Sequence, residues 1–277
     1  MKTIATLIFC IACTWQALAT DIKATMECMY EATYQTDTLA KRTTKALMVL
    51  RRNEERSLYF SQSGFEYDSL SQNATGLSGY YAVRDTIKAR YGGIKAHYYV
   101  LKDFVKSQLQ CAEMDLVKLQ YAEALPLFNW EITEEQKAIG QHQCQKAVCA
   151  FGGRTYEAWF APDIPISDGP WKFWGLPGLI VEVYDTQHHY EFRFLGMRPC
   201  TSNIEMPEND CAKSTKAECY RTIQKALDDP EAALRAMEGQ MGIKSIALAH
   251  QNFVPTPRWS ASSRSASRLY SPFRACA

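Results

Sequence analysis

The chain has 277 residues, of which 47% are hydrophobic, and its 31 Lys and Arg residues almost balance its 30 Asp and Glu residues. Non-specific binding to nucleic acid needs a basic excess, so this balance excludes it and we expect no nucleic-acid partner. The length is sufficient for one large domain with a substantial buried core.

The first 19 residues, MKTIATLIFCIACTWQALA, have the pattern of a secretory signal peptide. One lysine precedes an apolar run, Ile4–Cys13, and an Ala-Leu-Ala site follows it, which predicts cleavage before Thr20. A membrane-spanning helix needs about 20 apolar residues, and no segment here is that long. We therefore expect an exported protein that is not integral to the membrane. It would be periplasmic or extracellular, with association with the outer membrane left open.

Ten cysteines are present, and eight of them follow the predicted cleavage site. An even number in an exported chain predicts disulfide bonds. The near candidates are Cys144 with Cys149, and two of Cys200, Cys211 and Cys219. A zinc site is disfavoured because the sequence has no paired C-x-x-C spacing. We expect no metal and no cofactor.

Alternation of apolar and polar residues predicts a chain dominated by half-buried strands in an antiparallel sheet. The Asp185–His189 segment has the character of a hairpin turn between two such strands. The expected strands are Met26–Tyr34, Ala46–Leu50, Ser57–Ser61, His97–Val105, Met114–Tyr121, Arg154–Phe160, Leu179–Tyr184 and Tyr190–Leu195.

Few helices are expected. Leu77–Arg90 precedes a Gly-Gly pair, a short helix is predicted to start at Thr133 with acids in its first turn, and Thr215–Met241 is rich in helix formers. The predicted fold is mainly β (α+β): an open, curved antiparallel sheet or half-barrel bowl with a small number of helices. We expect one domain over 20–254 and a disordered, solvated Ser/Arg-rich tail over 255–277.

The segment 144–184 contains an ordered set of aromatic, proline and glycine positions. It includes Arg154-x-Tyr156-x-Ala158-Trp159-Phe160, Pro162-Asp163-Ile164-Pro165, Gly169-Pro170-Trp171-Lys172-Phe173 and the hexapeptide Gly175-Leu176-Pro177-Gly178-Leu179-Ile180. This set resembles the GLPGLI family of exported Bacteroidetes proteins, which is defined by its motif and has no assigned function. The resemblance implies the compartment and the class. It also suggests a fold-level analogy with the bowl-like N-terminal region of some bacterial peptide N-glycosidases.

Two interpretations of the Trp- and Pro-rich stretch compete. Proline fixes φ and removes a backbone donor, so the stretch must be an ordered loop rather than a central strand. In the favoured interpretation its rings plug one end of the curved sheet, with the hexapeptide as a structural turn. In the other, a site for a glycan, lipid or peptide is formed by Arg154, Trp159, Trp171, Lys172 and Trp174.

The sequence shows no catalytic motif. H-E-x-x-H, G-x-S-x-G and phosphate-cradling loops are absent, so we assign no catalytic residue and expect a protein that is not an enzyme. The first hypothesis is an exported envelope protein acting as a binding or accessory module with a concave apolar sheet, its partner an envelope protein, glycan, lipid or peptide. A glycan- or peptide-directed hydrolase would need two carboxylates, or a histidine beside serine or cysteine, in a cleft. A purely structural envelope component is the third hypothesis.

Overall fold

A computed structural model describes residues 22–37, 41–114, 117–207, 211–229, 231, 232 and 235. The predicted signal peptide and the predicted tail lie outside these residues. The described part of the chain forms twelve strands and three helices. In chain order these are β1 (Met26–Asp37), β2 (Arg42–Arg52), β3 (Arg56–Ser61), α1 (Gln62–Ser71), α2 (Gly76–Tyr91), β4 (Tyr98–Asp103), β5 (Gln108–Glu113), β6 (Leu119–Ala124), β7 (Glu131–Ile139), β8 (His142–Phe151), β9 (Arg154–Ala161), β10 (Leu179–Asp185), β11 (Tyr190–Pro199), β12 (Ala212–Lys213) and α3 (Lys216–Asp228).

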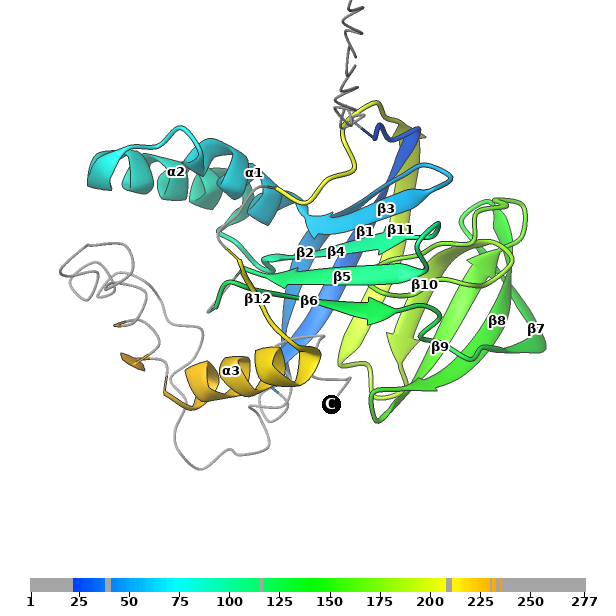
Figure 1. Cartoon of the computed structure of the whole chain (residues 1–277). Helices are drawn as coiled ribbons and strands as arrows, with labels where there is room; N and C mark the ends of the chain where they lie inside the picture. The colour runs from blue at the N-terminus through cyan, green and yellow to red at the C-terminus, as the bar shows by residue number, and fades with distance from the viewer. Residues whose placement is uncertain are drawn as a thin grey trace, which may run out of the picture.

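All twelve strands belong to one open sheet, which curves strongly (Figure 1). Its order is β12-β6-β5-β4-β3-β2-β1-β11-β10-β9-β8-β7. Two antiparallel meanders, β1 to β6 and β7 to β11, therefore meet where the first strand of one pairs with the last strand of the other. The two-residue β12 adds a parallel edge to β6. The prediction of a mainly β, open, curved sheet is confirmed.

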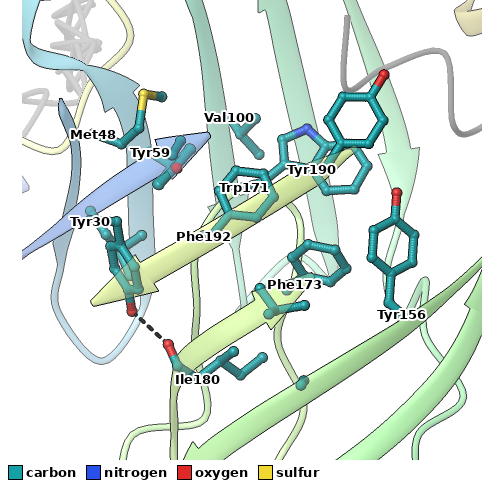
Figure 2. Close-up of a cluster of buried hydrophobic side chains, with 14 of the residues drawn as sticks. Tyr30, Met48, Tyr59, Val100, Tyr156, Trp171, Phe173, Ile180, Tyr190 and Phe192 are labelled. Atoms are coloured by element: carbon teal, nitrogen blue, oxygen red, sulfur yellow. Dashed lines mark hydrogen bonds between the residues drawn. The ribbon is translucent and has the colours of Figure 1, made fainter. Parts of the chain in front are cut away.

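One face of the sheet, here called the inner face, carries the larger core. Alternation along β1 places Cys28, Tyr30, Ala32 and Tyr34 on this face, all buried. Figure 2 shows Tyr30 pointing to β10, where its hydroxyl donates to the Ile180 carbonyl oxygen at 2.9 Å. Aromatic rings from both meanders thus fill the same space.

The opposite, outer face has a second, smaller core over β2 to β5, in which Val49, Leu58, Phe60 and Tyr99 are buried. Helix α1 packs beside it and α2 packs on α1, both projecting from one side of the sheet (Figure 1). The Asp68 carboxylate of α1 accepts hydrogen bonds from the Tyr99 hydroxyl at 2.5 Å and pairs with the His97 imidazole at 2.9 Å. This network fastens α1 to β4.

Two element predictions need correction. The helix expected to start at Thr133 is instead the edge strand β7. It pairs with β8 from Glu131, which lies opposite Val148, to Ile139, which lies opposite His142. The strand expected over Met114–Tyr121 has only its last residues in a strand, because β5 ends at Glu113 and β6 starts at Leu119; residues 115 and 116 lie outside the described ranges. Helix α2 and the described part of the Thr215–Met241 helix are confirmed.

No helix in the described ranges combines the length and the apolar character that crossing a bilayer requires.

Candidate functional site

The connection between β9 and β10, residues 162–178, lies against the inner face and contributes its aromatic rings to the core. Trp171 is 1% exposed and Phe173 is fully buried. Figure 2 shows both rings among those of the sheet; the Phe173 ring centroid lies 5.0 Å from that of Tyr156 and 6.0 Å from that of Phe192. This connection, here called the plug loop, therefore occupies the space that an open bowl would offer to a ligand.

A buried ion pair holds the plug loop to the sheet. The Lys102 ammonium of β4 donates to Asp168 Oδ1 at 2.5 Å and to the carbonyl oxygens of Gly169 and Phe173 at 2.8 and 3.1 Å. Arg52 of β2 places its Nε 3.6 Å from Asp168 Oδ2. Burial lowers the pKa of Lys102, and the neighbouring Asp168 carboxylate opposes that shift. The ammonium thus satisfies loop carbonyls and a loop carboxylate at once.

Lys172 fastens the same loop to the far end of the sheet. Its fully buried ammonium donates to the Tyr121 hydroxyl at 3.0 Å and to Glu123 of β6. Glu123 also accepts from Lys216 of α3 at 2.7 Å. Burial alone would raise the pKa of Glu123, but the two lysines more than offset it and hold that pKa below its usual value.

The hexapeptide closes the plug loop by a close approach of two backbones. A Cβ on Gly178 would lie 2.4 Å from the Ala161 carbonyl oxygen, so only glycine fits there. The Leu179 N–H then donates to the Ile164 carbonyl oxygen at 3.0 Å, which joins the two ends of the loop. Gly175 has φ +96°, a conformation that favours glycine. The GLPGLI segment is thus a turn whose last residues begin β10.

Trp159 lies away from the plug loop, on the outer face. Its neighbours across the ladders are Glu182 of β10 and Lys146 of β8. The ring is 6% exposed, and the Lys137 ammonium lies 4.2 Å from a Trp159 ring centroid. The indole N–H donates to the Tyr184 hydroxyl at 3.5 Å. The sheet therefore separates this tryptophan from Trp171.

The Arg154 side chain binds the β10–β11 hairpin. Its guanidinium donates to Asp185 Oδ2 at 2.6 Å and lies 5.0 Å from the Tyr190 ring centroid. The other Asp185 oxygen accepts from the Tyr190 N–H at 2.7 Å.

Trp174 is half-buried, with its ring 5.4 Å from that of Phe104. The five residues expected to bind a ligand therefore do not form one surface, because packing distributes them over two faces and a turn.

The predicted disulfides also need correction. Cys144 and Cys149 lie five residues apart on β8, which separates their Cα atoms by roughly 17 Å, far beyond the span of a disulfide. Cys200 and Cys219 are likewise free thiols in the described structure, and neither forms a disulfide with Cys211. Burial raises the pKa of the Cys149 thiol to about 12 and that of Cys219 to about 12.

A small hollow of about 130 Å³ lies on the outer face over β1, β10 and β11. Three of its side chains are carboxylates, which a glycan-directed hydrolase would use. Each is paired with a cation or an imidazole: Glu31 with Lys45 at 2.7 Å, Glu182 with Arg193 at 3.7 Å, and Glu191 with His188 at 2.8 Å. The lining residues are Glu31, Thr33, Lys45, Glu182, Tyr184, Glu191, Phe192 and Arg193. The arrangement is an array of cross-strand ion pairs.

A larger hollow of about 470 Å³ opens at the rim of the sheet, beside the β7–β8 hairpin. We call it the glutamine hollow, because its lining is Gln136, Gln141, Gln143, Cys144, Gln145, Pro162 and Asp163. Gln145 is paired with Phe160 of β9 on one side and Gln136 of β7 on the other. The hollow therefore continues the inner face outward, past the point where the plug loop fills it.

Most of the amide groups in the glutamine hollow are available. The Gln145 amide donates to the Thr133 carbonyl oxygen at 2.8 Å, whereas the exposed Gln136 and Gln143 side chains make no hydrogen bond within the described residues. Asp163 is held by the His142 imidazole at 2.6 Å. The alternating Q-H-Q-C-Q of residues 141–145 was the sequence signal for this site, which the sequence interpretation missed.

The glutamine hollow has little of the machinery of a nucleophilic enzyme. The Cys144 thiol donates to the His142 backbone carbonyl at 3.6 Å, and burial and the nearby Asp163 raise its pKa, which disfavours the thiolate. Among the described residues, no serine or cysteine side chain is hydrogen-bonded to an imidazole. The same residues hold no cluster of His, Cys, Asp and Glu able to ligate a metal ion.

Comparison with known proteins gives a match to a family model over a short segment and matches to solved structures. Residues 151–182 match the model of a family described as "Protein of unknown function (Porph_ging)". No match was found among curated proteins. Two of the similar solved structures, "Structure of PNGF-II in P21 space group" and "Structure of PNGF-II in C2 space group", are 12% identical, with TM-scores of 0.46 and 0.45. Each alignment covers 72% of this chain and 32% of the solved one, so the chain spans about a third of their length.

Proposed function

We propose that this chain is an exported cell-envelope protein of the GLPGLI type that acts as a non-enzymatic binding or accessory module. Its ligand binds in the glutamine hollow at the rim of the sheet. The predicted signal peptide supports export, and the motif of residues 144–184 supports the family. The hollow supports a binding role.

One observation carries the location of the site. The central inner face is filled by the plug loop, whose Trp171, Lys172 and Phe173 are buried, whereas the glutamine hollow beyond it is open. Binding sites are concave and present a few polar groups that fix the orientation of the ligand. The hollow has both properties, and the filled centre has neither.

Binding is favoured over hydrolysis by the state of the polar groups. A hydrolase needs a general base within hydrogen-bond reach of a nucleophile or water. Its environment must also keep the general acid protonated and the general base deprotonated. In the glutamine hollow the carboxylate of Asp163 is occupied by His142, and in the small hollow of the outer face each of the three carboxylates has a cation or imidazole partner. The exposed amides of Gln136 and Gln143, which make no hydrogen bond to the described residues, support a binding role over a purely structural one.

The binding role can be tested on protein purified from the envelope under native conditions. We expect native mass spectrometry to show a retained non-covalent adduct. The adduct should be lost in the double variant Gln136→Leu/Gln143→Leu and kept in Gln110→Leu, which replaces a half-buried glutamine of β5 that does not line the hollow. A wild-type protein without adduct, or equal adducts in all three proteins, would overturn the proposal.

Export is tested separately by fractionation of the producing cells. The mature protein is expected in the periplasmic or extracellular fraction, with an N-terminus at Thr20. Retention of Met1 and recovery only in the cytoplasm would contradict this part of the proposal without affecting the binding site.

A further inference from the structure

We infer that the ligand of the glutamine hollow is a neutral oligosaccharide. This inference rests on the binding role proposed above and names the class of ligand. It comes from one juxtaposition: the amides of Gln136, Gln143 and Gln145 face one open hollow whose single carboxylate, Asp163, is already paired.

The amide side chains match hydroxyl groups. Each glutamine presents one carbonyl oxygen that accepts and one NH₂ group that donates two hydrogen bonds, and a sugar hydroxyl can do both. The Gln136 and Gln145 positions are directly opposed on β7 and β8, so their Cβ atoms lie about 5 Å apart. Gln143 follows on the same face of β8, which extends the row of amides along the hollow. Adjacent hydroxyls on a sugar chain can meet such a row with both kinds of bond.

The charge of the hollow excludes the main ionic ligands. None of the seven described lining residues is a lysine or an arginine, so an acidic sugar, a phosphate or an acidic peptide would find no counterion. The one acid, Asp163, is already engaged, because its Oδ2 lies 2.6 Å from His142 Nδ1. A ligand without net charge loses the least hydration free energy on entering this site.

A lipid or a peptide fits the hollow less well. The lining has no leucine, isoleucine, valine or aromatic side chain among its described members, so an acyl chain would meet mostly amides. Recognition of an extended peptide uses free backbone groups and pockets for alternate side chains. Within the hollow the β8 backbone already pairs with β7 on one side and β9 on the other, and the free edge of β7 lies on the side of that strand away from β8. Sugar rings need only side-chain amides and a shallow wall such as Pro162.

The hollow is also large enough for such a ligand. Its volume of about 470 Å³ falls within the range of sites for small molecules, roughly 300–1,000 Å³. It is open at the rim, so a chain could continue beyond the contacted residues. The protein would therefore bind a short stretch of a longer neutral glycan.

Calorimetric titration of the full-length mature protein tests the inference. The probes are chitohexaose, laminarihexaose, maltohexaose and, as the peptide arm, an acetylated and amidated Gly-Ser hexapeptide. We expect at least one hexasaccharide to bind wild type and Gln110→Leu equally. Its affinity for Gln136→Leu/Gln143→Leu should fall by on the order of tenfold, because each lost hydrogen bond weakens binding several-fold. Both replaced side chains are exposed, so the melting temperature of the variant should stay that of wild type.

The outcomes separate the ligand class from the binding role. Binding of the peptide alone, dependent on the same two glutamines, would overturn the oligosaccharide and leave the binding module standing. Sugar binding that the double variant does not weaken would overturn the assignment to this hollow. Failure of every hexasaccharide to bind would overturn the oligosaccharide class, whereas the adduct experiment above decides the binding role itself.

Discussion

Lys102 and Asp168 form an ion pair of 2.5 Å between β4 and the plug loop, and neither side chain is exposed to solvent. The two residues are 66 positions apart in the chain. Lys102 also donates to two loop carbonyls, so the sheet supplies the charge that satisfies the polar groups of a buried loop. This lysine lowers the cost of burying the loop, because unpaired backbone oxygens are costly to remove from water.

Breaking this pair from one side should be strongly destabilising. We expect Asp168→Asn to lower the free energy of unfolding by about 3–5 kcal/mol, since it leaves a buried ammonium without its counterion. Lys102→Met/Asp168→Asn should lose clearly less than the sum of the two single variants. Urea denaturation of the four proteins measures this coupling. Additive losses would show that the two side chains stabilise the fold independently.

Gly178→Ala should destabilise the protein by about 1–3 kcal/mol, because the new Cβ would meet the Ala161 backbone rather than a flexible side chain. Gly140→Asn is the control: Gly140 has φ +60° and open space around it, and asparagine tolerates that conformation. Thermal unfolding of both variants gives the comparison. An unchanged melting temperature for Gly178→Ala would contradict the close approach of the two backbones.

The protein should lose stability in acid partly through Glu27. Burial would raise its pKa, but hydrogen bonds from Arg198 and Arg51 bring it below the ordinary 4.5. A lowered pKa in the folded state stabilises the protein fully above pH 4.5, and this contribution is lost as the pH falls through the folded value.

Glu27→Gln should therefore be less stable than wild type at neutral pH and should show a shallower loss of stability below pH 4.5. Glu134→Gln, at an exposed position of β7, serves as the control and should follow wild type. Denaturation curves at a series of pH values measure the slope. Parallel curves for Glu27→Gln and wild type would exclude this residue as an acid-sensitive ion-pair partner.

Thiol reactivity should follow burial. Cys200 and Cys211 are half-buried and should be alkylated first in the native protein. Cys28 and Cys149 should react only on unfolding, since burial raises the pKa of each thiol to about 12. Peptide mass spectrometry after iodoacetamide treatment without reductant reads every site. A disulfide-linked peptide joining two of the described cysteines would contradict the structure.

Local signals predicted the parts of the fold that local chemistry determines. The Asp185–His189 turn and its two flanking strands follow from alternation and turn residues, and the structure confirms them. Strand β7 was mistaken for a helix because Thr133 with the following acids forms a good helix start. Its strand conformation comes from pairing with β8, and both its faces are largely exposed, so it has no alternation to detect. Helix α1, which contains Gly64 and lacks an apolar stripe, was not predicted.

The candidate site was predictable only in part. Prolines and rings showed that residues 162–178 form an ordered loop, but not that Lys172 would be buried, because its partners Tyr121 and Glu123 lie about fifty positions away. Likewise, nothing in the sequence near Trp159 indicates that the sheet separates it from Trp171. The glutamine hollow needs β7, β8 and the end of β9 side by side, and β7 and β8 were not among the predicted strands.

The central claim is that the plug loop is a permanent part of the core rather than a lid over a bowl. Hydrogen exchange of the native protein tests it most directly at the amides of Phe173, Leu179 and Ile180, each of which donates to a carbonyl oxygen of the plug loop. We expect them to exchange only through global unfolding, with the same opening free energy as Val100 of β4. Exchange of the loop amides at a much lower opening free energy, while Val100 stays protected, would contradict the claim and reopen the inner face as a binding site.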